Sequence, residues 1–190
     1  MGCAELECSN LDRLRRPGQL IVANHPTLID AIAFMALMHQ VDVVVKAGHA
    51  DNFVLSGVIR GAGYIPNADG PALVDESVSL LKQGRSVVIF PEGTRSEPHG
   101  LNLFSRGAAH VAIRSGLDPL PVTIRCKPAT LYRGRAWWDV PDRKVRIRLD
   151  VGEAISLAEI LTEPMPTPRA ARAVTTALKA YFERHLELVG

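Results

Sequence analysis

The stretch Leu20-Ile21-Val22-Ala23-Asn24-His25-Pro26-Thr27-Leu28-Ile29-Asp30 decides the fold of this chain. Its first four residues form an apolar run that is typical of a buried strand. A second apolar run follows over residues 28–38 and predicts a helix. Because proline suits the first position of a helix, we expect this helix to begin at Pro26 and to continue to about residue 39.

Asp30 is the only charged residue of the apolar run 28–38. A buried carboxylate needs a partner that offsets its desolvation, and His25, in the turn before the expected helix, is the nearest candidate. A histidine held by a carboxylate can act as a general base. A structural interpretation stays open, because a buried His–Asp pair can also be an ordinary core contact.

The chain of 190 residues is long enough for one domain with a substantial core and too short for two. Its hydrophobic content of 47% and charged content of 22% are typical of a globular protein. No run approaches the ~18 consecutive apolar residues that a membrane-spanning helix needs. The three cysteines lack metal-ligand spacing, so we expect no metal site and a reducing cytoplasm.

The remaining chain alternates between strand-like and helix-like segments. Strands are expected at residues 41–45, 64–65, 86–90, 120–124 and 145–149, and helices at residues 53–59, 71–83, 105–115 and about 169–188. Residues before 17 are expected to be irregular. This alternation predicts an α/β fold with a mostly parallel central sheet flanked by helices. We expect a single domain over residues 1–190, with a core at roughly 18–152 and a C-terminal amphipathic helix that packs on the body or on a membrane surface.

A second polar motif follows the strand at residues 86–90 and reads Pro91-Glu92-Gly93-Thr94-Arg95-Ser96. Polar residues directly after a buried strand are the usual place for a site. Taken alone, Glu92 and Arg95 could also form an internal salt bridge that caps a turn.

Together the two motifs resemble those of the 1-acylglycerol-3-phosphate (lysophospholipid) acyltransferase family. The resemblance covers residues 20–125 and includes the strand at 120–124 and the Phe104-Ser105-Arg106-Gly107 turn. It implies a fold like that of the glycerophospholipid acyltransferases. The residues Pro26-Thr27-Leu28-Ile29, which separate His25 from Asp30, are similar to those of a bacterial subgroup associated with aryl-polyene or xanthomonadin-type pigment lipids. The chain departs from the family at Asn67, where an arginine that grips the acceptor's phosphate is expected.

The resemblance implies an O-acyltransferase that moves a fatty acyl group directly to a hydroxyl of a lysophospholipid or related lipid-like acceptor. The donor is a thioester of acyl carrier protein or coenzyme A, used as a co-substrate, and no cofactor is implied. His25 is the general base, Asp30 fixes its tautomer, and backbone N–H groups near residues 26–28 are candidates for the oxyanion hole. The expected acceptor-binding residues are Glu92, Gly93, Thr94 and Arg95, with Asn24, Asn67 and Arg106 as further substrate-binding candidates.

Two rival functions remain open at this stage. A basic module could use residues 125–148, which carry eight basic and two acidic side chains, to bind nucleic acid or an anionic membrane. A thioesterase could use the same His25–Asp30 pair with water. The basic stretch contains no recognisable nucleic-acid-reading motif, so we expect no nucleic-acid partner. We expect the protein in the cytoplasm, in peripheral contact with the inner face of the cytoplasmic membrane.

Overall fold

The computed structural model describes residues 4–27, 29–45, 64–66, 70–97, 100–130 and 141–187. Their elements are, in chain order, β1 (Ala4–Ser9), α1 (Leu11–Leu14), β2 (Leu20–Ala23), α2 (Asp30–Leu37), β3 (Val41–Val45), β4 (Tyr64–Pro66), α4 (Pro71–Lys82), β5 (Ser86–Ile89), α5 (Gly107–Ser115), β6 (Leu120–Lys127), β7 (Val145–Val151), α6 (Leu157–Ile160) and α7 (Thr167–Glu187). The helix expected over residues 53–59 and the candidate residue Asn67 lie outside the described residues.

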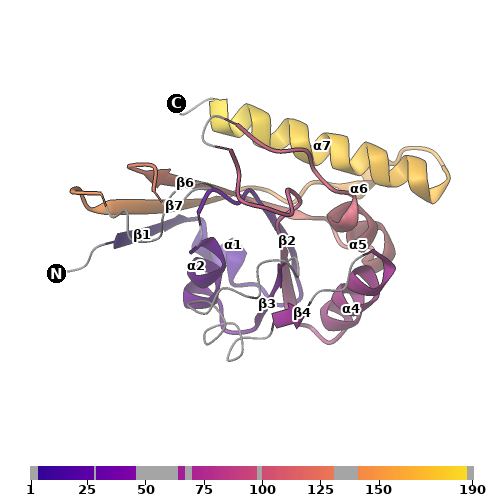
Figure 1. The fold of residues 1–190 in the computed structure, drawn as a ribbon. Helices are drawn as coiled ribbons and strands as arrows, with labels where there is room; N and C mark the ends of the chain where they lie inside the picture. The colour runs from indigo at the N-terminus through magenta and orange to yellow at the C-terminus, as the bar shows by residue number, and fades with distance from the viewer. Residues whose placement is uncertain are drawn as a thin grey trace.

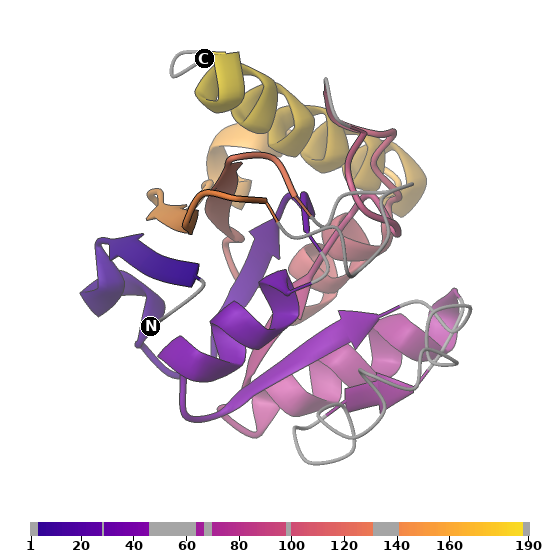
Figure 2. The same cartoon turned by 60° about the vertical axis from the view of Figure 1, so that its left-hand side comes forward.

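In the described part of the chain, the strands form one seven-stranded sheet in the order β1-β7-β6-β2-β5-β3-β4. Every neighbouring pair is parallel except β6 and β7, which are antiparallel. The expected α/β fold with a mostly parallel sheet is therefore confirmed. The C-terminal ends of β2, β5 and β6 meet at one edge of the sheet, and both sequence motifs follow directly on two of these strands (Figure 2).

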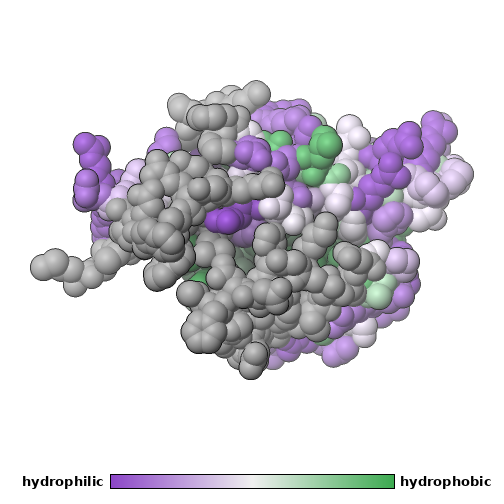
Figure 3. Space-filling model, viewed as in Figure 1, coloured by the Kyte–Doolittle hydropathy of each residue, from purple (hydrophilic) through white to green (hydrophobic). Residues whose placement is uncertain are grey.

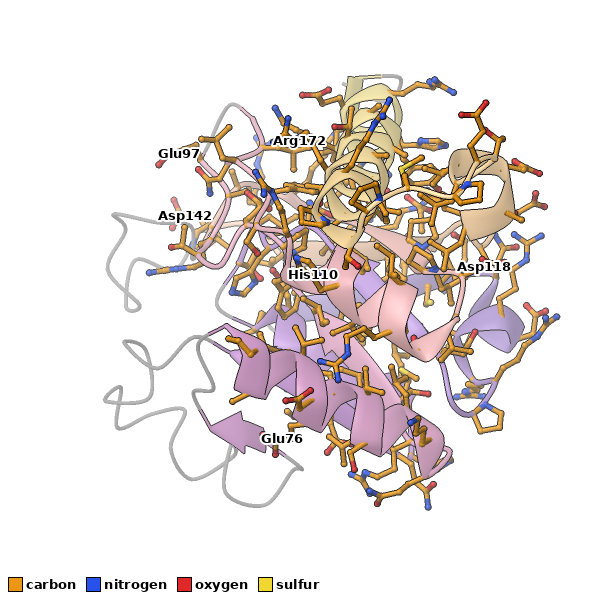
Figure 4. The ribbon with its side chains drawn as sticks, turned by 90° about the vertical axis from the view of Figure 1, so that its right-hand side faces the viewer. Glu76, Glu97, His110, Asp118, Asp142 and Arg172 are labelled. Carbon is orange, nitrogen blue, oxygen red and sulfur yellow. The ribbon has the colours of Figure 1, made fainter. Side chains whose placement is uncertain are left out.

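Helices cover both faces of the sheet, and each face has its own hydrophobic core. On one face α1 and α2 supply Leu14 and Phe34, which pack against alternate residues of the strands. On the other face α4, α5 and α7 pack together over the opposite side chains of β2 and β5 (Figure 1). Figure 4 shows these three helices side by side, with Glu76 on α4, His110 on α5 and Arg172 on α7.

The C-terminal helix packs on the body of the protein, as one of the two sequence-based alternatives expected. Its fully buried side chains Ala171, Val174, Leu178 and Phe182 belong to the second core. Among the described residues, no helix is long and apolar enough to cross a membrane. Where the surface is coloured in Figure 3, it is mostly hydrophilic, with small separate hydrophobic areas.

The segment before residue 17, expected to be irregular, instead contributes β1 and α1. Strand β1 pairs along its whole length with β7, about 140 positions later in the chain, from Ala4 opposite Val145 to Ser9 opposite Asp150. Its pairing is therefore fixed by a distant partner, which local sequence patterns do not reveal. The sheet therefore includes residues that precede residue 18, where the core was expected to begin.

The expected start of α2 at Pro26 is also wrong, since the helix begins at Asp30. A helix starting at Pro26 would use the carbonyl of His25 as the acceptor of its first hydrogen bond. That carbonyl instead accepts the N–H of Ser96 at 2.7 Å. This hydrogen bond to the second motif keeps the backbone at His25 out of the helix, which begins at Asp30.

Candidate active site

The side chains of His25 and Asp30 contact each other directly. His25 Nδ1 lies 2.9 Å from Asp30 Oδ2, and the Asp30 carboxylate is completely buried at the start of α2. Because an ionised carboxylate only accepts hydrogen bonds, this contact favours the imidazole tautomer with the proton on Nδ1 and the lone pair on Nε2. The side chain of His25 remains 19% exposed, which leaves the ring accessible.

Thr27 completes the hydrogen bonding of the buried carboxylate. Its backbone N–H donates to Asp30 Oδ2 at 2.8 Å, and its hydroxyl donates to Asp30 Oδ1 at 2.5 Å. With His25, the carboxylate has three donors in place of the water that it lost. Thr27 was not a candidate from the sequence, although a threonine three residues before an acidic residue is a recognised pattern at helix starts.

The ring of Phe90 supports the imidazole of His25 from one side. The two ring centroids lie 4.3 Å apart with an interplanar angle of 22°, and Phe90 follows β5 directly. Stacking fixes the plane of the imidazole, while Asp30 fixes its rotation within that plane. The segments that follow β2 and β5 thus each contribute one aromatic ring to the site.

Glu92, the first polar side chain of the second motif, points into the protein and is 8% exposed. Its Oε1 accepts the backbone N–H of His25 at 3.0 Å and the hydroxyl of Ser96 at 2.6 Å. Its Oε2 accepts the backbone N–H of Asn102 at 2.9 Å. The carboxylate therefore joins the loop after β2, the loop after β5 and the segment before α5.

The other residues of the second motif form the turn around Glu92. Gly93 has a φ of +65°, a conformation that suits glycine, and its N–H donates to the Phe90 carbonyl at 3.1 Å. Thr94 and Arg95 are partly exposed, and the carbonyl of Arg95 accepts the side-chain amide of Asn102 at 2.9 Å. Within this motif, Thr94 and Arg95 are partly exposed, whereas Glu92 is buried and accepts hydrogen bonds from its own chain.

The sequence profile of the family described as Acyltransferase matches residues 5–125, which is more than half of the chain. The chain belongs to the acyltransferase family. It is 32% identical over 108 residues to the chloroplastic 1-acyl-sn-glycerol-3-phosphate acyltransferase LPAT1 of Arabidopsis thaliana, covering 54% of this chain and 30% of that protein. It is 26% identical over 119 residues to the 1-acyl-sn-glycerol-3-phosphate acyltransferase of Borreliella burgdorferi, covering 58% of this chain and 46% of that protein. The chain thus spans less than half the length of these curated relatives.

The fold agrees with the family assignment. The crystal structure of the 1-acyl-sn-glycerophosphate acyltransferase PlsC from Thermotoga maritima superposes with a TM-score of 0.67, at 19% sequence identity. The alignment covers 98% of this chain and 72% of that one. The glycerophospholipid-acyltransferase-like fold inferred from the two motifs is therefore confirmed.

Asn24, a substrate-binding candidate, has both polar atoms engaged in this acyltransferase-family fold. Its Nδ2 donates to the carbonyl of Ile124 at 2.9 Å, and its Oδ1 accepts the N–H of Ile124 at 2.7 Å. The buried side chain thus behaves like a further strand residue that fastens the end of β2 to β6. This contact fixes the point at which the chain leaves the sheet, immediately before His25.

Of the backbone groups considered for the oxyanion hole, those of Pro26 and Thr27 offer no free N–H. Pro26 has no N–H, and the N–H of Thr27 donates to Asp30. Leu28 lies outside the described residues. The last substrate-binding candidate, Arg106, is exposed immediately before α5.

The sequence predicted the contact between His25 and Asp30 and placed Glu92 in the same site. It did not predict the residues that hold these three in position. These are Thr27, Phe90, Ser96 and Asn102. Only Thr27 carried a local signal, since the others act through contacts between separate loops. In the described part of the chain, no group of three or more histidine, cysteine or acidic residues could hold a metal ion.

Proposed function

We propose that this protein is an O-acyltransferase that moves an acyl group from a thioester directly to a hydroxyl of a lysophospholipid or related lipid-like acceptor. The observation that carries the proposal is the His25–Asp30 pair, in which Nδ1 is bound to a buried carboxylate and Nε2 is left as a base. The family assignment and the names of the relatives, which are acyltransferases for 1-acyl-sn-glycerol-3-phosphate, support it.

The reaction needs one proton carrier, because a thioester is already activated. His25 Nε2 takes the proton of the acceptor hydroxyl while the oxygen attacks the thioester carbonyl carbon. The buried Asp30 carboxylate stabilises the imidazolium that forms, as in other His–carboxylate pairs. When the tetrahedral intermediate collapses, the carbon–sulfur bond breaks, and the leaving thiolate takes the proton from Nε2. The histidine returns to its starting state without an acyl-enzyme.

The acceptor-binding side chains in this proposal are Thr94, Arg95 and Arg106. Thr94 and Arg95 lie in the loop after β5, and the segment before Arg106 is tied to that loop by the N–H of Ser105, which donates to the Pro91 carbonyl at 2.7 Å. Arginine suits a phosphate or carboxylate on the acceptor. Acyl carrier protein or coenzyme A supplies the thioester, and no cofactor takes part. We place the reaction at the inner face of the cytoplasmic membrane, with the protein in peripheral contact, because a lipid-like acceptor resides there.

The decisive experiment offers labelled acyl carrier protein and acyl-coenzyme A donors to a panel of lysolipids and alcohols, with mass analysis of the lipid product. The variant His25→Ala should lower product formation about 10²- to 10⁴-fold, the range of a lost general base. His110→Ala, on the partly exposed face of α5, is the matched control and should leave the rate unchanged. Full turnover by His25→Ala would overturn the proposal.

The same assay separates a thioesterase from a transferase. Free fatty acid released at the same rate with and without acceptor would show that water is the natural nucleophile.

The structure does not favour the alternative function of nucleic-acid binding, because the arginines of β7 are paired with acidic residues of this chain. Arg146 lies 3.5 Å from Glu5, and Arg148 lies 2.9 Å from Asp150.

A further inference from the structure

We propose that Phe90 is a positioning residue whose ring face stabilises the positive charge that His25 acquires during acyl transfer. The two ring centroids lie 4.3 Å apart with an interplanar angle of 22°, so the rings stack face to face. This inference rests on the proposed function, in which His25 Nε2 carries the proton from the acceptor hydroxyl to the leaving thiolate. It goes beyond that function by assigning part of the rate to an apolar side chain that exchanges no proton.

The strand pattern places both rings on the same face of the sheet. Val88 of β5 belongs to the core on the α2 face, and side chains alternate along a strand, so Phe90, two residues later, points to that face as well. Ala23 of β2 belongs to the same core, and His25 follows it by two residues. Because β2 and β5 are parallel neighbours, the two rings meet at the C-terminal edge of these strands.

Packing holds the ring of Phe90 in this orientation. The residue is 7% exposed, and the ring of the fully buried Phe34 of α2 lies 6.2 Å from it, centroid to centroid, at an angle of 57°. His25 is held independently, by Asp30 at Nδ1 and by Glu92 at its backbone N–H. The contact between the two rings is therefore formed before His25 becomes charged.

The face of a benzene ring carries partial negative charge and attracts a cation that lies within about 6 Å of its centroid. The imidazole of His25, at 4.3 Å, gains little from this attraction while it is neutral and more once it is an imidazolium. Interactions that are stronger in the transition state than in the ground state raise the rate of the chemical step. Proton transfer to His25 Nε2 makes this change, so the ring of Phe90 should accelerate acyl transfer and leave substrate binding unchanged.

Asp30 and Phe90 act on different parts of the imidazole. The carboxylate of Asp30 binds Nδ1 at 2.9 Å, whereas Phe90 covers one face of the ring. Water cannot solvate the imidazolium on a covered face, and an aliphatic side chain there would offer nothing in its place. An aromatic ring excludes the same water but presents the negative face of its quadrupole to the charge. The carboxylate makes the larger contribution, and we expect the ring to add a factor of about 2 to 30 in rate.

Fluorination tests the charge of the ring face while keeping the shape of the ring. Mono-, di- and trifluorinated phenylalanine, incorporated at position 90 alone, withdraw electron density from the face in steps. The single-turnover rate of acyl transfer at saturating acceptor should fall with each added fluorine, by about threefold in total, and the KM for the acceptor should not change. A rate that is independent of the number of fluorine atoms would overturn the inference.

Phe182 provides the matched control. Its ring is fully buried in the core on the opposite face of the sheet, where it contacts Phe104 and Tyr181. The same fluorinated residues at position 182 should leave the transfer rate unchanged. Thermal unfolding of both series shows whether fluorine disturbs the packing. Equal slowing in the two series would assign the effect to packing and overturn the inference.

Phe90→Leu measures the whole contribution of the ring and should slow transfer about tenfold at unchanged KM. A rise in the acceptor KM at an unchanged rate would show that the ring contacts the acceptor, and it would overturn the inference. Failure of the proposed function gives a different result, because the unsubstituted protein would then form no acylated product with any donor or acceptor. Failure of this inference alone leaves transfer intact and insensitive to fluorine at position 90.

Discussion

The carboxylate of Glu92 accepts the backbone N–H of His25 at 3.0 Å, so the second motif sets the position of the base in the first. The backbone of Ser96 strengthens the link by donating to the His25 carbonyl at 2.7 Å. The two motifs are 67 positions apart, and their meeting depends on the parallel pairing of β2 with β5. Glu92 is thus a positioning residue in this structure, since both of its oxygens accept hydrogen bonds from the chain itself.

Replacement of Glu92 by glutamine should therefore reduce both stability and kcat. The amide offers one acceptor oxygen and turns an N–H toward a backbone donor, either Asn102 or His25. Leaving such a buried donor unpaired costs about 1–3 kcal/mol of unfolding free energy. Denaturant unfolding and steady-state kinetics would measure the effect, and Glu76→Gln on the exposed face of α4 is the control. A rise in KM at unchanged stability would instead favour acceptor binding by Glu92.

Thr27→Val should lower kcat and leave KM nearly unchanged, because the contacts of the lost hydroxyl, to Asp30 and to the N–H of Ile29, lie within the protein. The buried carboxylate would keep two of its three donors, and we expect about a tenfold loss in rate, equal to about 1.4 kcal/mol. Thr27→Ser retains the hydroxyl and should restore most of the activity. If serine were as impaired as valine, packing of the threonine methyl group would be the cause and the hydrogen bond would not matter.

The sequence predicted the strands that carry the site, because buried parallel strands appear as short apolar runs such as residues 86–90. It also predicted the pair His25–Asp30, since a carboxylate in an apolar run demands a partner. It did not predict where α2 begins or where Glu92 points. Both depend on hydrogen bonds between loops that only the folded sheet brings together, and neither leaves a periodic pattern. Strand β1 was missed for the same reason, since its partner is β7.

The ion pair between Asp42 and Arg85 should be a main contributor to stability at the end of the sheet opposite His25. The carboxylate of Asp42 is buried on β3 and binds Arg85 through two hydrogen bonds of 2.6 and 2.8 Å. The hydrogen bond to Asp42 raises the pKa of the Arg85 guanidinium, so this arginine stays charged at all ordinary pH values. Arg85→Ala should cost about 2–4 kcal/mol by leaving a buried charge unpaired.

The double variant Asp42→Asn/Arg85→Ala tests this explanation. It removes the charge along with its partner and should recover part of the stability lost in Arg85→Ala. Denaturant unfolding of the four members of the cycle gives the coupling directly. Additive effects would mean that Arg85 acts through its packing and not through Asp42.

Cys126 should react slowly with alkylating reagents at neutral pH. Burial raises the pKa of its thiol, the nearby Asp30 charge raises it further, and a backbone hydrogen bond to Thr130 opposes both effects. The thiolate is the reactive form, so alkylation should accelerate only at a pH above that needed for a free cysteine. A chain with Cys3 and Cys8 replaced by serine isolates Cys126, and the same chain in denaturant is the control. Equal rates in the folded and denatured chains would contradict the prediction.

Gly152→Ala should destabilise the junction of β7 with α7, where the chain leaves no room for a side chain. A Cβ at this position would lie 2.1 Å from the hydroxyl oxygen of Tyr181 and 3.1 Å from Pro121 Cγ. Because the ring of Tyr181 is stacked on His185 with centroids 3.9 Å apart, it cannot move without breaking that contact. We expect a loss of about 1–3 kcal/mol, the usual cost of overpacking. Adding Tyr181→Phe removes the closest atom and should restore part of the thermal stability. No recovery in the double variant would place the strain on the Pro121 side, and unchanged stability in Gly152→Ala would show that Tyr181 moves freely.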